Sequence, residues 1–135
     1  QTKITWTSFC AKLESEILSM GEEVNDFAKE MGVESLSRDR VISMSYDLLG
    51  LITFLTMGEE ESRAWPIRKG ATALRAAGTI HSDIEHGFIR AETVSYKDLI
   101  ASGSWAEARK QGHMRLEGKN YIVQDGDIVF FRFKV

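Results

Sequence analysis

One stretch in the middle of the chain, residues 76–96, most constrains how this sequence can fold. It begins in an alanine-rich segment that is predicted to end as a helix at Gly78, and it continues through a polar corner before an extended run after Gly87. Glycine reaches positive φ angles without steric cost, so glycine at a helix end and again before a strand is typical of turns. The stretch therefore predicts a helix and a corner that cover neighbouring strands.

The first fifty residues have mainly helical patterns. Apolar residues recur at helical spacing in the segments 11–20, 24–31 and 37–49. Ser37 is predicted to cap the third helix, and a glycine follows each of the three segments. Lys3–Phe9 is rich in β-branched and aromatic residues, which favours a short strand ahead of the helices.

The remainder of the chain mixes strand and helix patterns. The predicted strands are 51–57, 62–67, 88–96, 119–123 and 127–135, and the predicted helices are 71–77 and 97–110, the second interrupted by Gly103. Pro66 has no backbone N–H, so its strand is expected at a sheet edge. Asp125-Gly126 predicts a hairpin between the last two strands, in which Val129, Phe131, Phe133 and Val135 share one face. This order predicts an α+β domain with helices on one face of a mixed sheet.

Composition narrows the function classes. The net charge is −3, but residues 1–50 carry 5 basic and 9 acidic side chains (net −4) and residues 51–135 carry 12 and 11 (net +1). The second part can therefore accept a polyanion without requiring one. The single Cys10 excludes an internal disulfide and fits a reducing compartment, and no apolar run approaches the ~20 residues of a membrane span. We expect a cytoplasmic protein with no membrane segment and no secretory signal.

Two sets of residues carry groups that occur in metal or catalytic sites, but neither set is predicted to form such a site. His81, Asp83 and His86 offer ligands for a metal or an acid–base pair, yet their spacing matches no established signature, so capping of the neighbouring elements is the favoured interpretation. Cys10 could be activated at a helix N-terminus, but a small packed residue is favoured. No catalytic residue and no metal site are predicted.

Basic residues on the predicted strands suggest a nucleic-acid surface. The candidates for RNA or ribosome binding are Arg63, Lys69, Arg75, Arg90 and Arg132. Aromatic residues lie among them (Trp65, Phe88 and Phe130), and a sheet that presents aromatic and arginine side chains can stack bases and hold phosphates. The alternative is a solvated sheet face whose charges pair with acidic neighbours. Trp105 is either an anchor for a protein partner or, as we favour, packed on its own sheet.

Several blocks of sequence resemble one family. They are Tyr46–Phe54, Arg63–Trp65, Ile80–Asp83, Gly87–Glu92 and Met114–Asp127. In order and over most of residues 46–135, they are similar to the C-terminal part of the YchF, or Obg-like ATPase, family. The resemblance implies that residues 51–135 form a TGS domain, which is a ubiquitin-like β-grasp fold. Departures are Leu74-Arg75 for a usual Pro-Gln pair, Pro66 for threonine and Lys134 for asparagine.

The resemblance is weaker over residues 1–50, which it implies are the end of the nucleotide-binding domain. Phe9–Glu14 is similar to the corner that contacts the nucleotide base, so Cys10, Ala11 and Lys12 are the implied remnant of that site. The chain would then start inside the last strand of that domain. No G-x-x-x-x-G-K-S/T phosphate loop occurs in this sequence, so no cofactor is expected for the chain itself.

The function that the resemblance implies is that of a part of a larger protein. The full-length protein would hydrolyse ATP, and GTP less favourably, with Mg. This chain would act as a ribosome- or RNA-binding module without catalysis of its own. The alternative is a regulatory piece that docks only on its own nucleotide-binding domain, and a third hypothesis is a small enzyme at the His81–His86 corner. A homodimer through the strand at Lys3–Phe9 is also expected.

Overall fold

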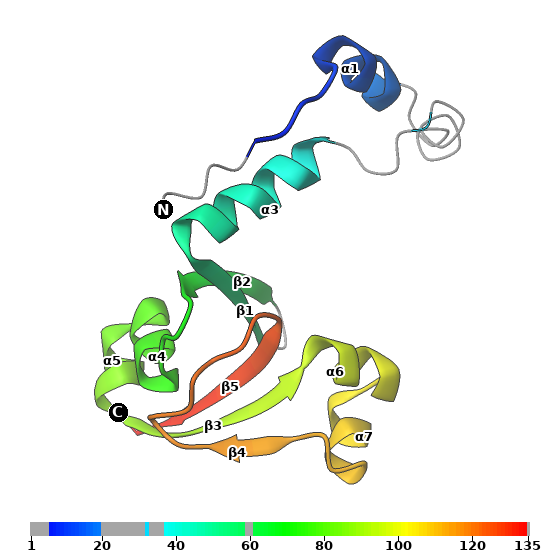
Figure 1. Cartoon of the computed structure of the whole chain (residues 1–135). Helices are drawn as coiled ribbons and strands as arrows, with labels where there is room; N and C mark the ends of the chain where they lie inside the picture. Colours follow the sequence, from blue (N-terminus) through cyan, green and yellow to red (C-terminus); the bar gives the residue numbers. More distant parts are fainter. Residues whose placement is uncertain (1–5, 20–31, 33–36, 59–60, 135) are drawn as a thin grey trace. The chain divides into compact units, whose positions relative to one another are not determined.

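The computed structural model describes residues 6–19, 32, 37–58 and 61–134 of the chain (Figure 1). The chain divides into two compact units, Gln1–Leu49 and Gly50–Val135. The first contains helices, and the second combines helices with a five-stranded sheet. The α+β fold class predicted from the sequence is confirmed.

The first unit contains helices α1 (Ala11–Ser19) and α3 (Ser37–Leu49). Ile17 of α1 is fully buried. The carboxylate of Glu14 accepts two hydrogen bonds from Ser37, one from its backbone N–H at 2.8 Å and one from its hydroxyl at 2.5 Å. A carboxylate at a helix N-terminus satisfies a free N–H and complements the helix dipole. Glu14 therefore caps α3, the role that the sequence assigns to Ser37.

The strand predicted at Lys3–Phe9 is absent from residues 6–9, which the structure describes as irregular, and residues 3–5 lie outside its described part. A strand forms only with a neighbour that pairs with its backbone, and residues 6–9 pair with no strand of the described chain. The helix predicted at 24–31 lies outside the described residues.

The second unit is built on a mixed sheet with the strand order β2-β1-β5-β3-β4. Its strands are β1 (Leu51–Met57), β2 (Ser62–Arg68), β3 (Phe88–Ser95), β4 (Arg115–Glu117) and β5 (Asp127–Phe133). Strand β5 runs parallel to β1 and antiparallel to β3, while β1–β2 and β3–β4 are antiparallel pairs. This topology is consistent with the expected β-grasp arrangement. Pro66 lies on the edge strand β2, as predicted.

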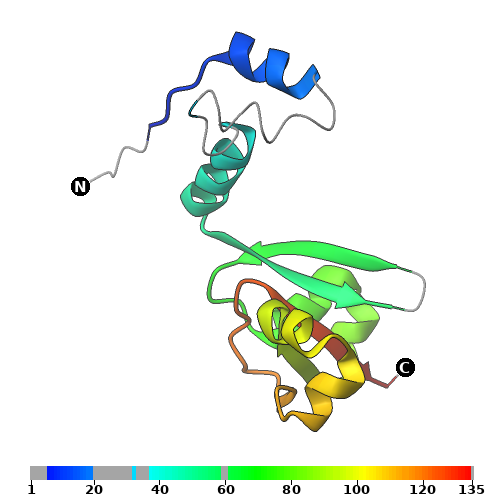
Figure 2. The same cartoon turned by 90° about the vertical axis from the view of Figure 1, so that its right-hand side faces the viewer.

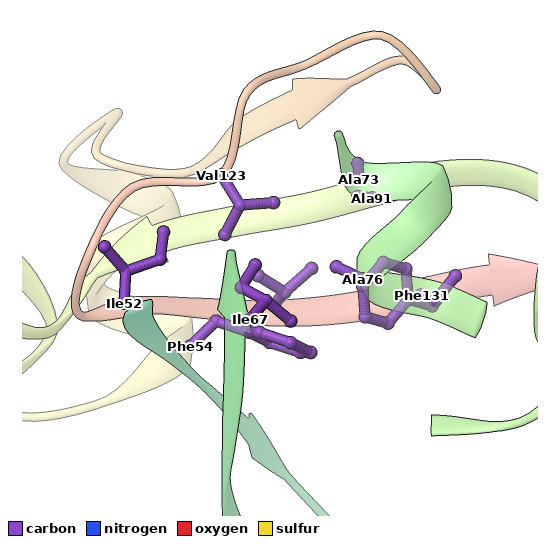
Figure 3. Packing of buried hydrophobic residues seen from close by; sticks show 10 residues of the cluster. Ile52, Phe54, Ile67, Ala73, Ala76, Ala91, Val123 and Phe131 are labelled. Carbon is purple, nitrogen blue, oxygen red and sulfur yellow. The ribbon is translucent and has the colours of Figure 1, made fainter. Parts of the chain in front are cut away.

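One face of the sheet packs against helices α4 (Ala73–Ile80) and α5 (Ser82–His86). The buried residues of this cluster are Ile52, Phe54, Ile67, Ala73, Ala76, Ala77, Ala91, Val123, Val129 and Phe131 (Figure 3). The ring of Phe131 lies edge-on to those of Phe54 and Phe88, with both centroid distances 6.1 Å. Val129 and Phe131 of the predicted stripe thus supply the core, while Phe133 is 40% exposed and Val135 lies outside the described residues.

The other face packs against helices α6 (Tyr96–Ser102) and α7 (Trp105–Lys110). Here Val94 and Ile128, which are register partners, are buried with Leu99 and Ala108. Side chains alternate between the two faces of a strand, so Ile128 and Val129 point in opposite directions. Figure 2 shows the yellow helices in front of red β5 and the green helices behind it. The expectation of helices on one face is therefore wrong, and Trp105 packs on its own domain.

The helix expected to end at Gly78 continues to Ile80, and the backbone N–H of its C-cap His81 donates to the Ala77 carbonyl. A Cβ at Gly78 would meet the Glu85 carboxylate at 2.5 Å, so the missing side chain leaves room for the Glu85 side chain of α5. The predicted polar corner is the short helix α5. The His81 ring accepts the N–H of Asp83 at 3.1 Å at its start.

The hairpin predicted at Asp125-Gly126 is wrong. Strand β4 lies at Arg115–Glu117, and β3 separates it from β5. The turn is fixed instead against β1: the Thr53 N–H donates to the Asp125 carboxylate, and the Gly126 N–H donates to the Thr53 carbonyl, both at 2.8 Å. These two hydrogen bonds hold the turn against β1, the strand with which β5 pairs in parallel.

Candidate nucleic-acid interface

The structure brings together only two of the five predicted cations. Arg90 on β3 and Arg132 on β5 are register partners, so their side chains leave the same face of the sheet. Arg63 lies elsewhere, on β2, with its guanidinium 4.4 Å from the ring centroid of Trp65. Arg75 on α4 forms an ion pair of 3.4 Å with a carboxylate on α5, and Lys69 lies in the turn after β2.

A buried carboxylate, Glu92, organises the face that carries Arg90 and Arg132. Its side chain is only 10% exposed and accepts hydrogen bonds from Arg132 and, at 2.9 Å, from Arg109 of α7. Burial of a charged carboxylate is tolerated when guanidinium groups donate hydrogen bonds to its oxygens. One negative charge therefore holds two arginines, whose side chains remain 53% and 59% exposed.

Apolar side chains lie beside this ion pair. Phe130 and Leu116 are the register partners of Glu92 on the two adjacent strands, and they are 52% and 58% exposed. We call the surface formed by Arg90, Glu92, Arg109, Leu116, Phe130 and Arg132 the cationic face. It carries three guanidinium groups against one carboxylate, around an exposed aromatic ring. Such a surface can hold phosphate groups and stack a base.

Sequence reasoning missed Arg109 and Glu92 as parts of this face. Glu92 is one of the acidic neighbours that the alternative of a solvated sheet face invokes, and Arg109 belongs to the predicted helix 97–110. Seventeen residues separate the two, and no spacing rule links them. The alternation of β3 does offer a signal, because it predicts that Arg90 and Glu92 share a face.

The remaining candidates lie apart from the cationic face. Cys10 precedes α1 and is exposed rather than packed, and its carbonyl accepts the N–H of Glu14 at 3.0 Å. Ala11 and Lys12 form the exposed first turn of α1. The Nδ1 atom of His86 is bound to the Ser82 carbonyl at 2.7 Å, so both histidines of the corner serve local hydrogen bonds.

No group of three or more His, Cys, Asp or Glu side chains among the described residues could hold a metal ion. No helix in the described part of the chain is long and apolar enough to cross a membrane.

The fold and the cationic face together define a small α+β domain with a basic surface. A family model named YchF-GTPase_C and described as "Protein of unknown function (DUF933)" matches residues 51–134. The chain belongs to this YchF C-terminal family. It is similar to proteins called "Ribosome-binding ATPase YchF" from Bacillus subtilis strain 168, with 55% identity, and Escherichia coli O157:H7, with 48%, each over 127 residues. The predicted family is confirmed.

The chain spans about a third of these relatives: both alignments cover 93% of this chain and 35% of the relative. The solved structure of the Schizosaccharomyces pombe YchF GTPase matches 89% of this chain and 32% of its own, with a TM-score of 0.78 and 34% identity. A GTP binding protein from Pyrococcus horikoshii shares the fold, with a TM-score of 0.53 and 23% identity over 98% of this chain and 33% of its own.

Proposed function

We propose that this chain is an RNA-contacting module of a ribosome-binding YchF protein. The observation that carries the proposal is the cationic face, where Arg109 and Arg132 share the Glu92 carboxylate beside Arg90 and exposed Phe130. The printed names of the relatives support a ribosomal setting. In the whole protein, we expect ATP hydrolysis with Mg to take place in the part of the relatives that this chain does not cover. We expect the protein to be cytoplasmic.

The proposed mode of binding follows from the geometry. Arg109 and Arg132 are already oriented by Glu92, so little side-chain freedom is lost when each donates its remaining N–H groups to phosphate oxygens. Phe130 offers a ring face to a neighbouring base, and stacking of this kind tolerates any base. We therefore expect backbone recognition of single-stranded or loop RNA with weak sequence preference.

Fluorescence anisotropy with a labelled single-stranded RNA tests this function. With about three phosphate contacts, log K should fall with log salt with a slope of about −2. Arg132→Ala and Arg109→Ala should each weaken binding about three- to tenfold, as expected for one lost exposed ion pair. Arg75→Ala is the matched control, because it removes the same charge from α4 on the opposite side of the sheet. Absence of binding, or an equal loss in the control, would overturn the proposal.

A second function is favoured by a different observation. Trp6, Phe9 and Leu48 of the first unit are 81%, 55% and 69% exposed, and apolar residues in such numbers are typical of interaction surfaces. We propose that this unit docks on the nucleotide-binding domain of the whole protein, with Cys10, Ala11 and Lys12 near the base. Separate expression of the two parts tests it, and failure to co-purify would exclude stable docking. Homodimerisation of the isolated chain stays a prediction.

A further inference from the structure

A hollow of about 400 Å³ lies where β3 begins and β4 ends. Its walls come from the first residues of β3 and from the turn that follows β4: Phe88, Ile89, Arg90, Glu117, Gly118, Lys119, Asn120 and Tyr121. Its volume is within the range of small-ligand sites. We call it the β3–β4 pocket.

The β3–β4 pocket has an uncompensated positive charge. Arg90 and Lys119 form no ion pair with any residue in the described part of the chain, and the Glu117 carboxylate pairs with Arg115 at 3.4 Å. Arg90 also lies directly opposite Arg132, and like charges in register on adjacent strands repel each other. Glu92 neutralises Arg132 but makes no ion pair with Arg90. An anion in the pocket would relieve this repulsion.

The fold holds these groups in place. The register between β3 and β5 shifts at Ile89, and bulges of this kind redirect side chains and occur beside functional sites. The Arg90 Nη1 atom lies 3.6 Å from where a Cβ on Gly118 would stand, which places the guanidinium beside the turn that follows β4.

Two backbone hydrogen bonds fix the turn that carries the second cation. The Tyr121 N–H donates to the Gly118 carbonyl at 3.0 Å, and the Leu74 N–H donates to the Lys119 carbonyl at 3.2 Å. The backbone of Lys119 is therefore anchored to α4, and only its side chain needs ordering when an anion binds. A pre-organised site loses less entropy on binding.

We propose that the β3–β4 pocket binds a phosphate group of an RNA backbone through Arg90 and Lys119, with the Asn120 side-chain amide as a third donor. This inference rests on the proposed function and names a position for one phosphate beyond the cationic face. Arg90 connects the two surfaces, because it belongs to both. A strand that crosses Phe130 can therefore continue toward the pocket.

The test combines two probes on the whole 135-residue chain. Amide chemical shifts are followed while inorganic phosphate is added, with chloride at equal ionic strength as the reference, and labelled single-stranded RNA is titrated by anisotropy. Arg90→Ala and Lys119→Ala are the test variants. Lys97→Ala is the matched control, since this exposed lysine lies just beyond the opposite end of β3. All these side chains are exposed, so melting temperatures should match the wild type.

We expect phosphate to shift the amides of residues 118–120 in the wild type but not in Arg90→Ala. Each test variant should bind RNA three- to tenfold more weakly. Its slope of log K against log salt should be shallower by the contribution of about one phosphate contact, while RNA binding by the control variant should be unchanged. If neither variant changes RNA binding, the proposal that the β3–β4 pocket binds an RNA phosphate is refuted, and the proposed function of the chain still holds. Phosphate shifts without any RNA binding by the wild type would overturn the function and the RNA phosphate as ligand. Absence of both signals would overturn both.

Discussion

Phe131 is one of the two aromatic residues buried in the core of the second unit, and replacing it by alanine tests the fold directly. Its side chain is 7% exposed and contacts the rings of Phe54 and Phe88 edge-on. Truncation of a buried phenylalanine costs about 3–5 kcal/mol, which includes the lost aromatic pairs and the cavity that remains. A unit the size of Gly50–Val135 has about 4–13 kcal/mol of total stability. Phe131→Ala should therefore remove a large share of it.

The neighbouring residue supplies the control. Phe130 lies on the same strand but faces the other way and is 52% exposed, so Phe130→Ala should cost about 1 kcal/mol or less. Urea unfolding followed by circular dichroism measures both variants against the wild type. If Phe131→Ala does not fold, Phe131→Leu should still unfold at lower urea, with a loss of about 1–2 kcal/mol. Equal stabilities of the Phe130 and Phe131 variants would refute the assignment of the buried face.

Two further predictions concern the backbone and a partly buried hydroxyl. Gly87→Ala should destabilise the fold strongly in thermal melts, because its Cβ would overlap the Lys134 carbonyl, whereas Gly118→Ala should be tolerated. Burial and then the hydrogen bond to Asp127 raise the pKa of Tyr121. Neutral Tyr121 therefore adds stability that is fully present below the unfolded pKa of about 10 and is lost as pH rises above it. In Tyr121→Phe, the fall of stability between pH 9 and 11 should be smaller than in the wild type.

Much of the fold could be predicted because local and tertiary preferences agree there. Strands β1, β2 and β3 lie within a residue or so of their predicted bounds. The break between α6 and α7 falls at Gly103, whose φ of 76° suits glycine. The proline at position 66 restricts its strand to an edge by removing a hydrogen-bond donor, whatever else surrounds it.

The segment 119–123 shows where sequence reasoning failed. Its tyrosine, isoleucine and valine favour a strand, but tertiary contacts direct it to the start of α4 instead. Ile122 forms an isolated bridge with Thr72, and the Val123 N–H donates to the Ala71 carbonyl at 3.0 Å. The three-residue strand β4 has no comparable pattern, since Arg115–Glu117 contains no β-branched or aromatic residue.

A buried polar network explains why the connection into β5 takes this path. Asp127 is 2% exposed, and its carboxylate accepts hydrogen bonds from the Tyr121 hydroxyl at 2.7 Å and the Gln124 N–H at 2.9 Å. Arg115 adds an ion pair at 3.3 Å. These partners fix the loop between them, and none of the pairings can be deduced from sequence spacing.

The candidate site was predictable by residue type but not by arrangement. Arg90 and Arg132 were identified as cations on strands, yet only the register of β3 and β5 places them side by side. Lys119 was not identified, because its role depends on a turn anchored to a distant helix.

Glu92 links stability to the proposed function, and Glu92→Gln should change the two in opposite directions. Glutamine keeps the shape of the side chain but removes the charge that Arg109 and Arg132 share. Hydrogen bonds to charged groups contribute about 1.5–3 kcal/mol each, and both arginines are more than half exposed, so we expect a loss of about 1–2 kcal/mol in urea unfolding.

The same substitution should strengthen RNA binding. It weakens the orientation of Arg109 and Arg132, but it also removes the one carboxylate of the cationic face. The local net charge rises by one, which at a few ångströms in a solvated site outweighs the lost orientation and amounts to about 1 kcal/mol, or roughly fivefold in affinity. Anisotropy at 50 mM and 200 mM salt measures the gain, which should shrink at the higher salt because of screening. If Glu92→Gln loses stability and RNA affinity together, then Glu92 is needed to orient the arginines, and the carboxylate contributes to binding by positioning them rather than opposing it by charge.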